Sequence, residues 1–175
     1  MEVEEASVQI TVPEHEEHAH KKLVIVAWSG DLDRAWPQMI LATTGAAMGM
    51  QTTVFFTFWG LFSLVKEDVR ITGDNWMQKM VAMMDHPGVH HLKLGKMNFA
   101  GMGPAMMKKL AKEHSVASPS ELLEMARDLG VQLVPCQMTM DLLGLRREDM
   151  IDGLAEPVGA TAMLLEAQDA VTFFI

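Results

Sequence analysis

The chain has a single cysteine among its 175 residues and no excess of basic residues. One cysteine cannot form an intrachain disulfide, so a disulfide-stapled scaffold is excluded. Because no Cys-x-x-Cys pair is present, a dithiol redox cycle within one chain is excluded as well. No Gly-Lys-Ser or Gly-Lys-Thr follows a glycine-rich turn, so the sequence contains no nucleotide-binding P-loop.

The negative charge is concentrated near the start of the chain. There are 23 acidic and 14 basic residues, which gives a net charge of −9. Six of the acidic residues precede Lys21, the first lysine or arginine, so 17 acidic residues remain against the 14 basic ones. We expect an acidic, His-containing flexible tail over residues 1–20 and a single domain over residues 21–175. A nucleic-acid-binding protein would carry a basic face, so no nucleic-acid partner is expected.

The composition also bears on compartment and core. Hydrophobic residues make up 49% of the chain, which is enough to bury a sizeable core. The first residues are acidic, and they lack the basic segment and apolar run of a secretory signal. A reducing, cytoplasmic location is therefore the simplest interpretation.

No charged residue occurs between Arg34 and Lys66. About 20 apolar residues can cross a bilayer, so the stretch needs an explanation. Glycines and polar residues interrupt it near Gly49, and the run Val54–Trp59 after the break is β-branched and aromatic. This pattern predicts a helix followed by a buried strand, with no membrane span.

Strand-like and helix-like segments alternate along the domain. The predicted strands are Lys22–Trp28, Gln51–Trp59, a weak one over Val89–Leu94, Val131–Pro135 and Val171–Ile175. Helical connections of this length force neighbouring strands to be parallel and place helices on both faces. The sequence therefore predicts a three-layer α/β/α sandwich with a mostly parallel, doubly wound sheet of about five strands. Ligands bind beyond the carboxyl ends of the strands in such sheets.

Cys136 directly follows one predicted strand and precedes a predicted helix that begins at Gln137 or Met138. A thiol in this place faces free backbone N–H groups and the positive end of the helix dipole, which favour the reactive thiolate. The alternative is a structural role, because free cysteine is among the most buried residue types. Position alone leaves both interpretations open.

Three segments resemble the DsrE/DsrF/DsrH-like family, and in particular its DsrE-like branch. The cysteine segment Val131–Leu145 resembles the family's Cys-Gln-Met-Ser-Met-Asp run, with Thr139 where many members have serine. Lys96–Lys109 resembles the Met- and Gly-rich central loop. Lys22–Gly30 followed by Thr53–Gly60 resembles the first two strands. The resemblance covers residues 21–175.

The resemblance implies a sulfur-relay role in sulfur trafficking or sulfur oxidation. Cys136 would accept sulfane sulfur as a persulfide or a thiosulfonate and pass it to a partner thiol. The implied partners are a rhodanese-type sulfurtransferase and a small thiol sulfur-carrier protein. Some members have a second cysteine, which this chain lacks. The chain would thus be a sulfurtransferase-like carrier rather than a multi-turnover enzyme.

The family resemblance also implies a homotrimer or hexamer, and we take Ala35–Val65 as the candidate subunit interface. The expected substrate pocket combines strand ends with the central loop, which can present backbone N–H groups to an anion. Its candidate residues are Ser29, Gly30, Phe58, Trp59, Met97, Asn98, Gly101, Met102 and Gly103.

Neither a metal nor a cofactor is expected. The 17 methionines are typical of core filling and of a subunit interface, because no His/Cys cluster accompanies them as at a copper site. His90 and His91 are adjacent in a predicted strand and would point to opposite faces.

Two other functions fit the same residues. A non-catalytic, oligomeric module could hold a small ligand at the strand ends with Cys136 structural. A peroxide-reducing thiol protein would form a sulfenic acid on Cys136 and need a partner thiol to resolve it.

Overall fold

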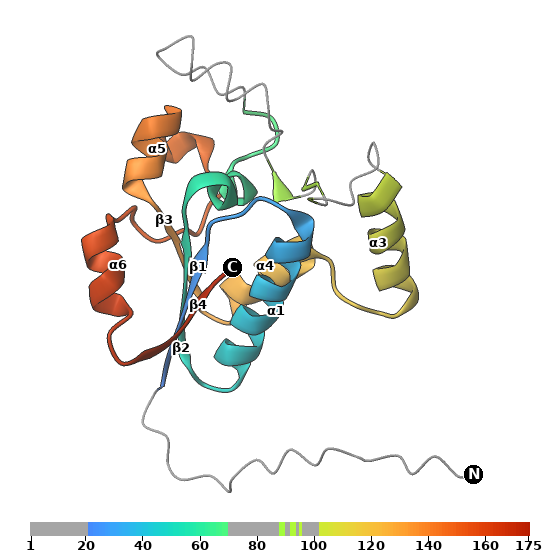
Figure 1. Ribbon diagram of the computed structural model, residues 1–175, viewed down its shortest axis with the longest axis horizontal. Coiled ribbons are helices and arrows are strands. Elements are labelled where there is room, and N and C mark those ends of the chain that lie inside the picture. The colour runs from blue at the N-terminus through green and yellow to red at the C-terminus, as the bar shows by residue number, and fades with distance from the viewer. Residues whose placement is uncertain (1–20, 70–87, 90–91, 94, 96–101) are drawn as a thin grey trace, which may run out of the picture.

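The computed structural model describes residues 21–69, 88–89, 92–93, 95 and 102–175 (Figure 1). Its centre is a sheet of four parallel strands in the order β3-β2-β1-β4. The strands are β1 (Lys22–Ala27), β2 (Gln51–Phe56), β3 (Gln132–Pro135) and β4 (Ala170–Phe174). Because β4 lies on the opposite side of β1 from β2 and β3, the strand order reverses at β1.

Helices lie on both faces of the sheet, which confirms the predicted α/β/α class. Helices α1 (Leu32–Ala47) and α4 (Pro119–Asp128) pack together on one face, and α6 (Ala160–Glu166) lies on the other (Figure 1). Helix α3 (Met102–Glu113) lies beyond α1, and α5 (Gln137–Leu143) follows β3 at its carboxyl end.

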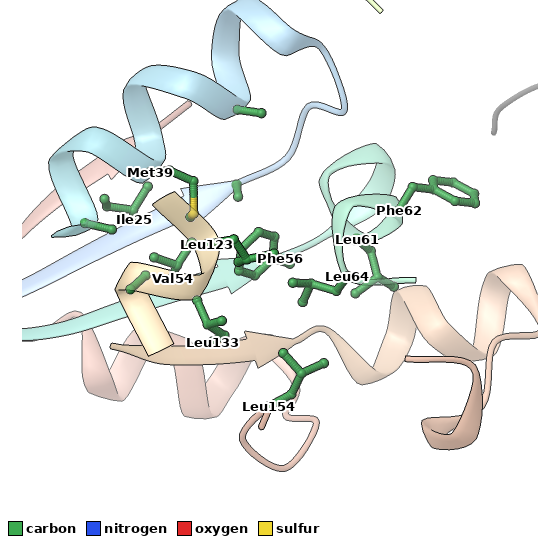
Figure 2. Close-up of a cluster of buried hydrophobic side chains, with 14 of the residues drawn as sticks. Ile25, Met39, Val54, Phe56, Leu61, Phe62, Leu64, Leu123, Leu133 and Leu154 are labelled. Carbon is green, nitrogen blue, oxygen red and sulfur yellow. The ribbon is translucent and has the colours of Figure 1, made fainter. Parts of the chain in front are cut away.

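The larger core lies between the sheet and the α1–α4 layer (Figure 2). Alternate residues of the strands, such as Ile25, Val54 and Leu133, point into this layer and are fully buried or nearly so. Met39 of α1 and Leu123 of α4 meet them from the other side. The period of two along each strand therefore assigns one set of side chains to this face.

The intervening strand residues form a second, smaller cluster beneath α6. It consists of Val24, Phe55, Val134, Cys136 and Met163. The single cysteine thus belongs to the α6 face, because it continues the alternation of β3 by two residues from Val134.

Local signals set the ends of α4. The Ser118 side chain accepts a hydrogen bond from the Glu121 N–H, while the Glu121 carboxylate accepts one from the Ser118 N–H at 2.7 Å. These bonds form a capping box. They hold the pKa of Glu121 below its ordinary value of 4.5, chiefly through the Ser118 backbone hydrogen bond and then the Ser118 side chain. Gly130 has φ of 77° just beyond the helix, a left-handed conformation that favours glycine at this position.

Two expectations are corrected by the structure. Strand β2 ends at Phe56, and Phe58–Leu64 forms a 3-10 helix instead of a strand end. Of the weak strand predicted over Val89–Leu94, the described residues 89, 92 and 93 are not in a strand, and the remainder lies outside the described residues.

The charge-free stretch forms α1, β2 and the 3-10 helix that follows. Within the part of the chain that the structure describes, no helix is long and apolar enough to cross a membrane. The stretch supplies much of the core, including Phe56 and Leu61.

Candidate functional site

Cys136 lies where β3 ends and α5 begins, as the sequence predicts. Its N–H donates to the Phe56 carbonyl oxygen at 2.9 Å, which extends the pairing of β3 with β2 by one residue. Its carbonyl oxygen accepts from the Met140 N–H at 3.0 Å, the first turn of α5. The backbone at Cys136 is therefore fixed from both directions.

A short segment covers the outer edge of β3 beside the cysteine. Val158 pairs with Cys136 in a parallel bridge, and the Gln137 N–H donates to the Val158 carbonyl oxygen at 3.0 Å. The Val158 N–H donates in turn to the Pro135 carbonyl oxygen at 3.1 Å. The pairing leads directly into α6, because this segment ends at Gly159, the N-terminal cap of that helix.

The Cys136 side chain is only 2% exposed. It packs with Phe55 of β2 and Met163 of α6 in the smaller cluster. Apolar neighbours of this kind shelter a sulfur atom from water and from stray thiols. They also mean that a reaction partner reaches the thiol only after a neighbouring side chain moves.

Thr139, three residues after the cysteine, ties α5 to the end of β2. Its hydroxyl lies 3.1 Å from the Thr57 hydroxyl and accepts from the Phe58 N–H at 3.2 Å. Thr139 is 2% exposed, so these bonds are made away from water. A buried hydroxyl with two partners fixes the turn that follows β2 against the helix that follows β3.

Phe58 has φ of 46°, a left-handed conformation that is rare for a bulky residue. The Phe58 backbone is kept in this conformation by the hydrogen bond from its N–H to the Thr139 hydroxyl and by the 3-10 helix that it begins. The turn directs Phe58 and Trp59 toward solvent at the carboxyl end of the sheet, where their side chains are 51% and 43% exposed. Backbone strain of this kind is concentrated at functional sites.

An apolar pocket of about 800 Å³ opens between the α6 face of the sheet and α6. Strand residues form its floor, aromatic rings from the strand ends form its rim, and α6 forms its side. The lining residues are Val26, Trp28, Phe55, Thr57, Phe58, Trp59, Ala160, Met163, Leu164, Ala167, Thr172 and Phe174. The pocket spans β1, where the strand order reverses, which is the usual ligand position in open α/β sheets.

Ring contacts hold the rim of this pocket. The Trp28 and Phe174 rings stack with centroids 6.2 Å apart. The Arg34 guanidinium carbon lies 5.1 Å from the centroid of the Trp28 ring, although Arg34 does not line the pocket. The Trp59 ring stacks on Phe62 at 6.0 Å.

Cys136 does not line the pocket but lies directly behind its wall. Phe55 and Met163 belong both to the pocket lining and to the cluster that contains the cysteine. These two side chains therefore separate the thiol from the pocket.

The structure brings some of the expected pocket residues together. Phe58 and Trp59 line the pocket. Ser29 is buried and accepts from the Asp31 N–H at 3.2 Å, while Gly30 lies so close to the Trp59 backbone that a Cβ there would come within 2.8 Å of its carbonyl oxygen. Ser29 and Gly30 therefore support the rim without lining the pocket.

The expected residues of the central loop are not brought to this pocket where the structure describes them. Met102 and Gly103 begin α3, and Met102 is 65% exposed. Neither lines the pocket or belongs to the cluster around Cys136. Met97, Asn98 and Gly101 lie outside the described residues.

Most of the pocket was not identified from the sequence. The missed residues of the sheet follow a simple alternation, since Val26 and Trp28, Phe55 and Thr57, and Thr172 and Phe174 are pairs separated by one residue. That period of two assigns each pair to one face. Strand order could not be predicted from the sequence, however, so nothing indicated that β4 and α6 lie beside β1.

Among the residues the structure describes, no group of three or more His, Cys, Asp or Glu side chains is arranged to hold a metal ion. His90 and His91 lie outside those residues.

Comparison with known proteins identifies the family. The profile of the DsrE/DsrF/DrsH-like family matches residues 19–174. The chain belongs to the DsrE/DsrF/DrsH-like family. A relative at 42% identity over 145 residues is the sulfur carrier protein DsrE2 of Allochromatium vinosum, with 81% of this chain and 89% of that protein covered. The uncharacterized protein YrkE of Bacillus subtilis is also 42% identical, over 156 residues, with 89% of this chain and 97% of YrkE covered.

Solved structures show the same DsrE-like fold at low sequence identity. The YchN protein of E. coli superimposes with a TM-score of 0.54 at 12% identity, covering 89% of this chain and 99% of YchN. The MTH1491 protein of Methanobacterium thermoautotrophicum gives a TM-score of 0.50 at 11% identity with the same coverage. These comparisons confirm the predicted DsrE-like architecture.

Proposed function

We propose that this chain is a sulfur carrier that accepts sulfane sulfur on Cys136 and passes it to a partner thiol. The observation that carries the proposal is the position of the chain's single cysteine at the carboxyl end of β3, behind an apolar pocket. Membership of a family that includes the sulfur carrier protein DsrE2 supports the same role.

The transfer chemistry needs only one cysteine in this chain. The Cys136 thiolate attacks the outer sulfur of a donor persulfide, the donor S–S bond breaks, and the donor leaves as a thiolate. The product is a Cys136 persulfide. The reverse step on an acceptor thiolate returns Cys136 to its starting state. A thiosulfonate on Cys136 is the alternative bound form.

The burial of Cys136 suits storage of a reactive sulfur. A persulfide exposed on the surface would be lost to any thiol in solution, whereas a group 2% exposed reacts only when its cover opens. We propose a rhodanese-type sulfurtransferase as donor and a small thiol sulfur-carrier protein as acceptor, in the cytoplasm. Docking of either partner would move the side chains that cover Cys136 and so expose the thiol.

Intact-mass spectrometry of the purified protein tests the proposal. The chain is incubated separately with polysulfide, thiosulfate and tetrathionate, and Cys136→Ser is treated in parallel. We expect a mass gain of one or more sulfur atoms, or of a thiosulfonate group, that a reducing agent reverses and Cys136→Ser abolishes. Native protein that gains no mass from any donor would contradict the proposal.

The second candidate is a non-catalytic module that holds an apolar ligand with Cys136 as a core residue. The 2% exposure of the thiol and the uncharged pocket favour it. Alkylation separates the two candidates. A carrier's thiol is modified by iodoacetamide in the native state at a rate well above that of global unfolding, whereas a purely structural thiol reacts only after denaturation.

A further inference from the structure

The pocket beside Cys136 carries no charge. None of its lining side chains is ionisable at neutral pH. Its two hydroxyl groups are already engaged, because Thr57 pairs with Thr139 at 3.1 Å and Thr172 donates to the Ala170 carbonyl oxygen at 3.4 Å. An anion bound against the floor of the pocket would therefore give up part of its water without gaining a charged partner or a free hydroxyl group.

This environment discriminates between classes of sulfur donor. Thiosulfate and tetrathionate are dianions, and moving such a group into an apolar site without a partner is strongly unfavourable. An uncharged chain or ring of sulfur atoms is polarisable and makes favourable contacts with aromatic rings. The stacked pair of Trp28 and Phe174 offers such rings at the rim.

We propose that the pocket binds an uncharged sulfane-sulfur molecule, of which cyclo-octasulfur is the simplest, and delivers it to Cys136. The inference rests on the proposed carrier function and names its donor class. The pocket volume of about 800 Å³ falls within the range of about 300–1,000 Å³ that is common for small-molecule sites.

The chemical step is balanced without any oxidant or reductant. The Cys136 thiolate, whose proton has gone to solvent, attacks one sulfur of the ring, and the adjacent ring S–S bond breaks. The electron pair of that bond remains on the far end of the opened chain. The product is a linear polysulfide attached to Cys136 that ends in a sulfide anion. An acceptor thiolate can then remove sulfur from it.

Met163 controls passage from the pocket to the thiol. It lines the pocket, it packs in the cluster around Cys136, and it is the one buried side chain of α6. The end of the helix also carries the Lys22–Glu166 ion pair of 3.3 Å, which is part-exposed to solvent. An unbranched methionine can adopt another rotamer at small cost.

Two neighbouring leucines of α6 provide a matched test. Leu164 lines the pocket and is 71% exposed, while Leu165 is 60% exposed and does not line it. Because both are exposed, lysine at either position leaves the fold intact. Sulfur uptake by wild type, Leu164→Lys and Leu165→Lys is measured by intact mass with cyclo-octasulfur and with tetrathionate, against Cys136→Ser as background.

We expect wild-type protein to gain sulfur at least about tenfold faster from cyclo-octasulfur than from tetrathionate. In Leu164→Lys the ratio of the two rates falls by about tenfold or more, because the ammonium group attracts the dianion and opposes the apolar ring. Leu165→Lys retains the wild-type ratio.

Equal wild-type rates with the two donors, or equal ratios in the two lysine variants, would overturn the neutral-donor inference and leave the carrier function standing. A Leu164→Lys variant that lowers the sedimentation mass without changing the ratio would also overturn it, because the pocket would then be a contact between subunits. No uptake from any donor, inorganic polysulfide included, would instead reject the carrier function itself.

Discussion

At the scale of single residues, the hydroxyl of Thr139 joins the two strand ends that frame the site. Replacing Thr139 by valine leaves the Phe58 N–H and the Thr57 hydroxyl without their partner. We expect the free energy of unfolding to fall by about 1–3 kcal/mol, because a buried polar group that loses its partner keeps its desolvation cost. Urea unfolding followed by circular dichroism measures the change.

Thr139→Ser is the matched control, because it keeps the hydroxyl and removes only a methyl group. We expect its free energy of unfolding to fall by about 1 kcal/mol or less. If the valine and serine variants were equally stable, the hydroxyl would have no structural role of this kind.

Gly60 is required by packing between strand ends. A Cβ at this position would overlap the Ala27 carbonyl oxygen, and the Gly60 N–H donates to the Trp28 carbonyl oxygen at 3.1 Å. Because backbone atoms occupy the space, Gly60→Ala must displace the 3-10 helix from β1. We expect the free energy of unfolding to fall by about 1–3 kcal/mol. Thermal unfolding measures the change.

Gly159→Ala serves as the comparison for Gly60, because nothing lies within 4 Å of the Cβ it would add. It should change stability by less than about 1 kcal/mol. If the two alanine variants lost the same stability, the close approach of Gly60 to β1 would not explain the loss in Gly60→Ala.

Cys136 is the residue that the sequence identified most directly. Its place between strand and helix follows from neighbours in the chain, and the structure confirms that place. Its contact with Met163 of α6 could not be predicted, because the pairing depends on which sheet face α6 covers. Local sequence predicts where a residue lies along a helix or strand, but it does not predict which side chains of a distant element contact that residue.

At the scale of elements, the capping box of α4 makes a contribution to the stability of the folded protein that depends on pH. The folded state lowers the pKa of Glu121 below 4.5, so the carboxylate stabilises the helix at higher pH. This stabilisation is complete well above pH 4.5 and is lost as the pH falls through the folded-state pKa. We therefore expect Glu121→Gln to lower the Tm at neutral pH and to differ less and less from wild type as the solution becomes more acidic.

Glu124→Gln, on the same helix but outside the capping box, is the matched control. Thermal unfolding at a series of pH values compares the two variants. A Glu121→Gln difference that persisted unchanged at low pH would contradict the role of the ionised carboxylate.

The boundary of β2 shows why some elements are harder to predict than others. The aromatic run to Trp59 favours a strand throughout, yet the strand ends at Phe56. The Phe58 N–H is taken by the Thr139 hydroxyl, 81 residues away, and not by a neighbouring strand. By contrast, the start of α4 depends on residues within the helix and directly beside it, so local sequence is enough to indicate it.

At the scale of the whole molecule, we propose that residues 21–175 form one domain whose stability does not depend on residues 1–20. Removing those residues removes six acidic side chains and no lysine or arginine. We expect a variant that begins at Lys21 to unfold in one transition with a Tm close to that of the full chain. Scanning calorimetry measures both, and two separate transitions or a large fall in Tm would contradict the single-domain boundary.

Self-association is a further expectation for the whole molecule. The candidate interface over Ala35–Val65 leaves large apolar side chains exposed, with Ile40 at 41% and Met48 at 75%. Exposed apolar surface of this kind marks interaction sites when it is contiguous. Sedimentation equilibrium should give three or six times the chain mass of 19.4 kDa. A monomer at micromolar concentration would reject the expected trimer or hexamer.

The edge position of β4 has a consequence for how the protein opens. Within the described part of the chain, strand β4 pairs only with β1, and four of its five side chains are exposed. Segments with few buried side chains open locally at a low free-energy cost. We therefore expect the β4–α6 unit to detach more readily than β1, β2 or β3, and its detachment would uncover Cys136. For the proposed sulfur carrier, access of a partner thiol to Cys136 would then depend on this local unfolding equilibrium, which amide hydrogen exchange in β4 would report.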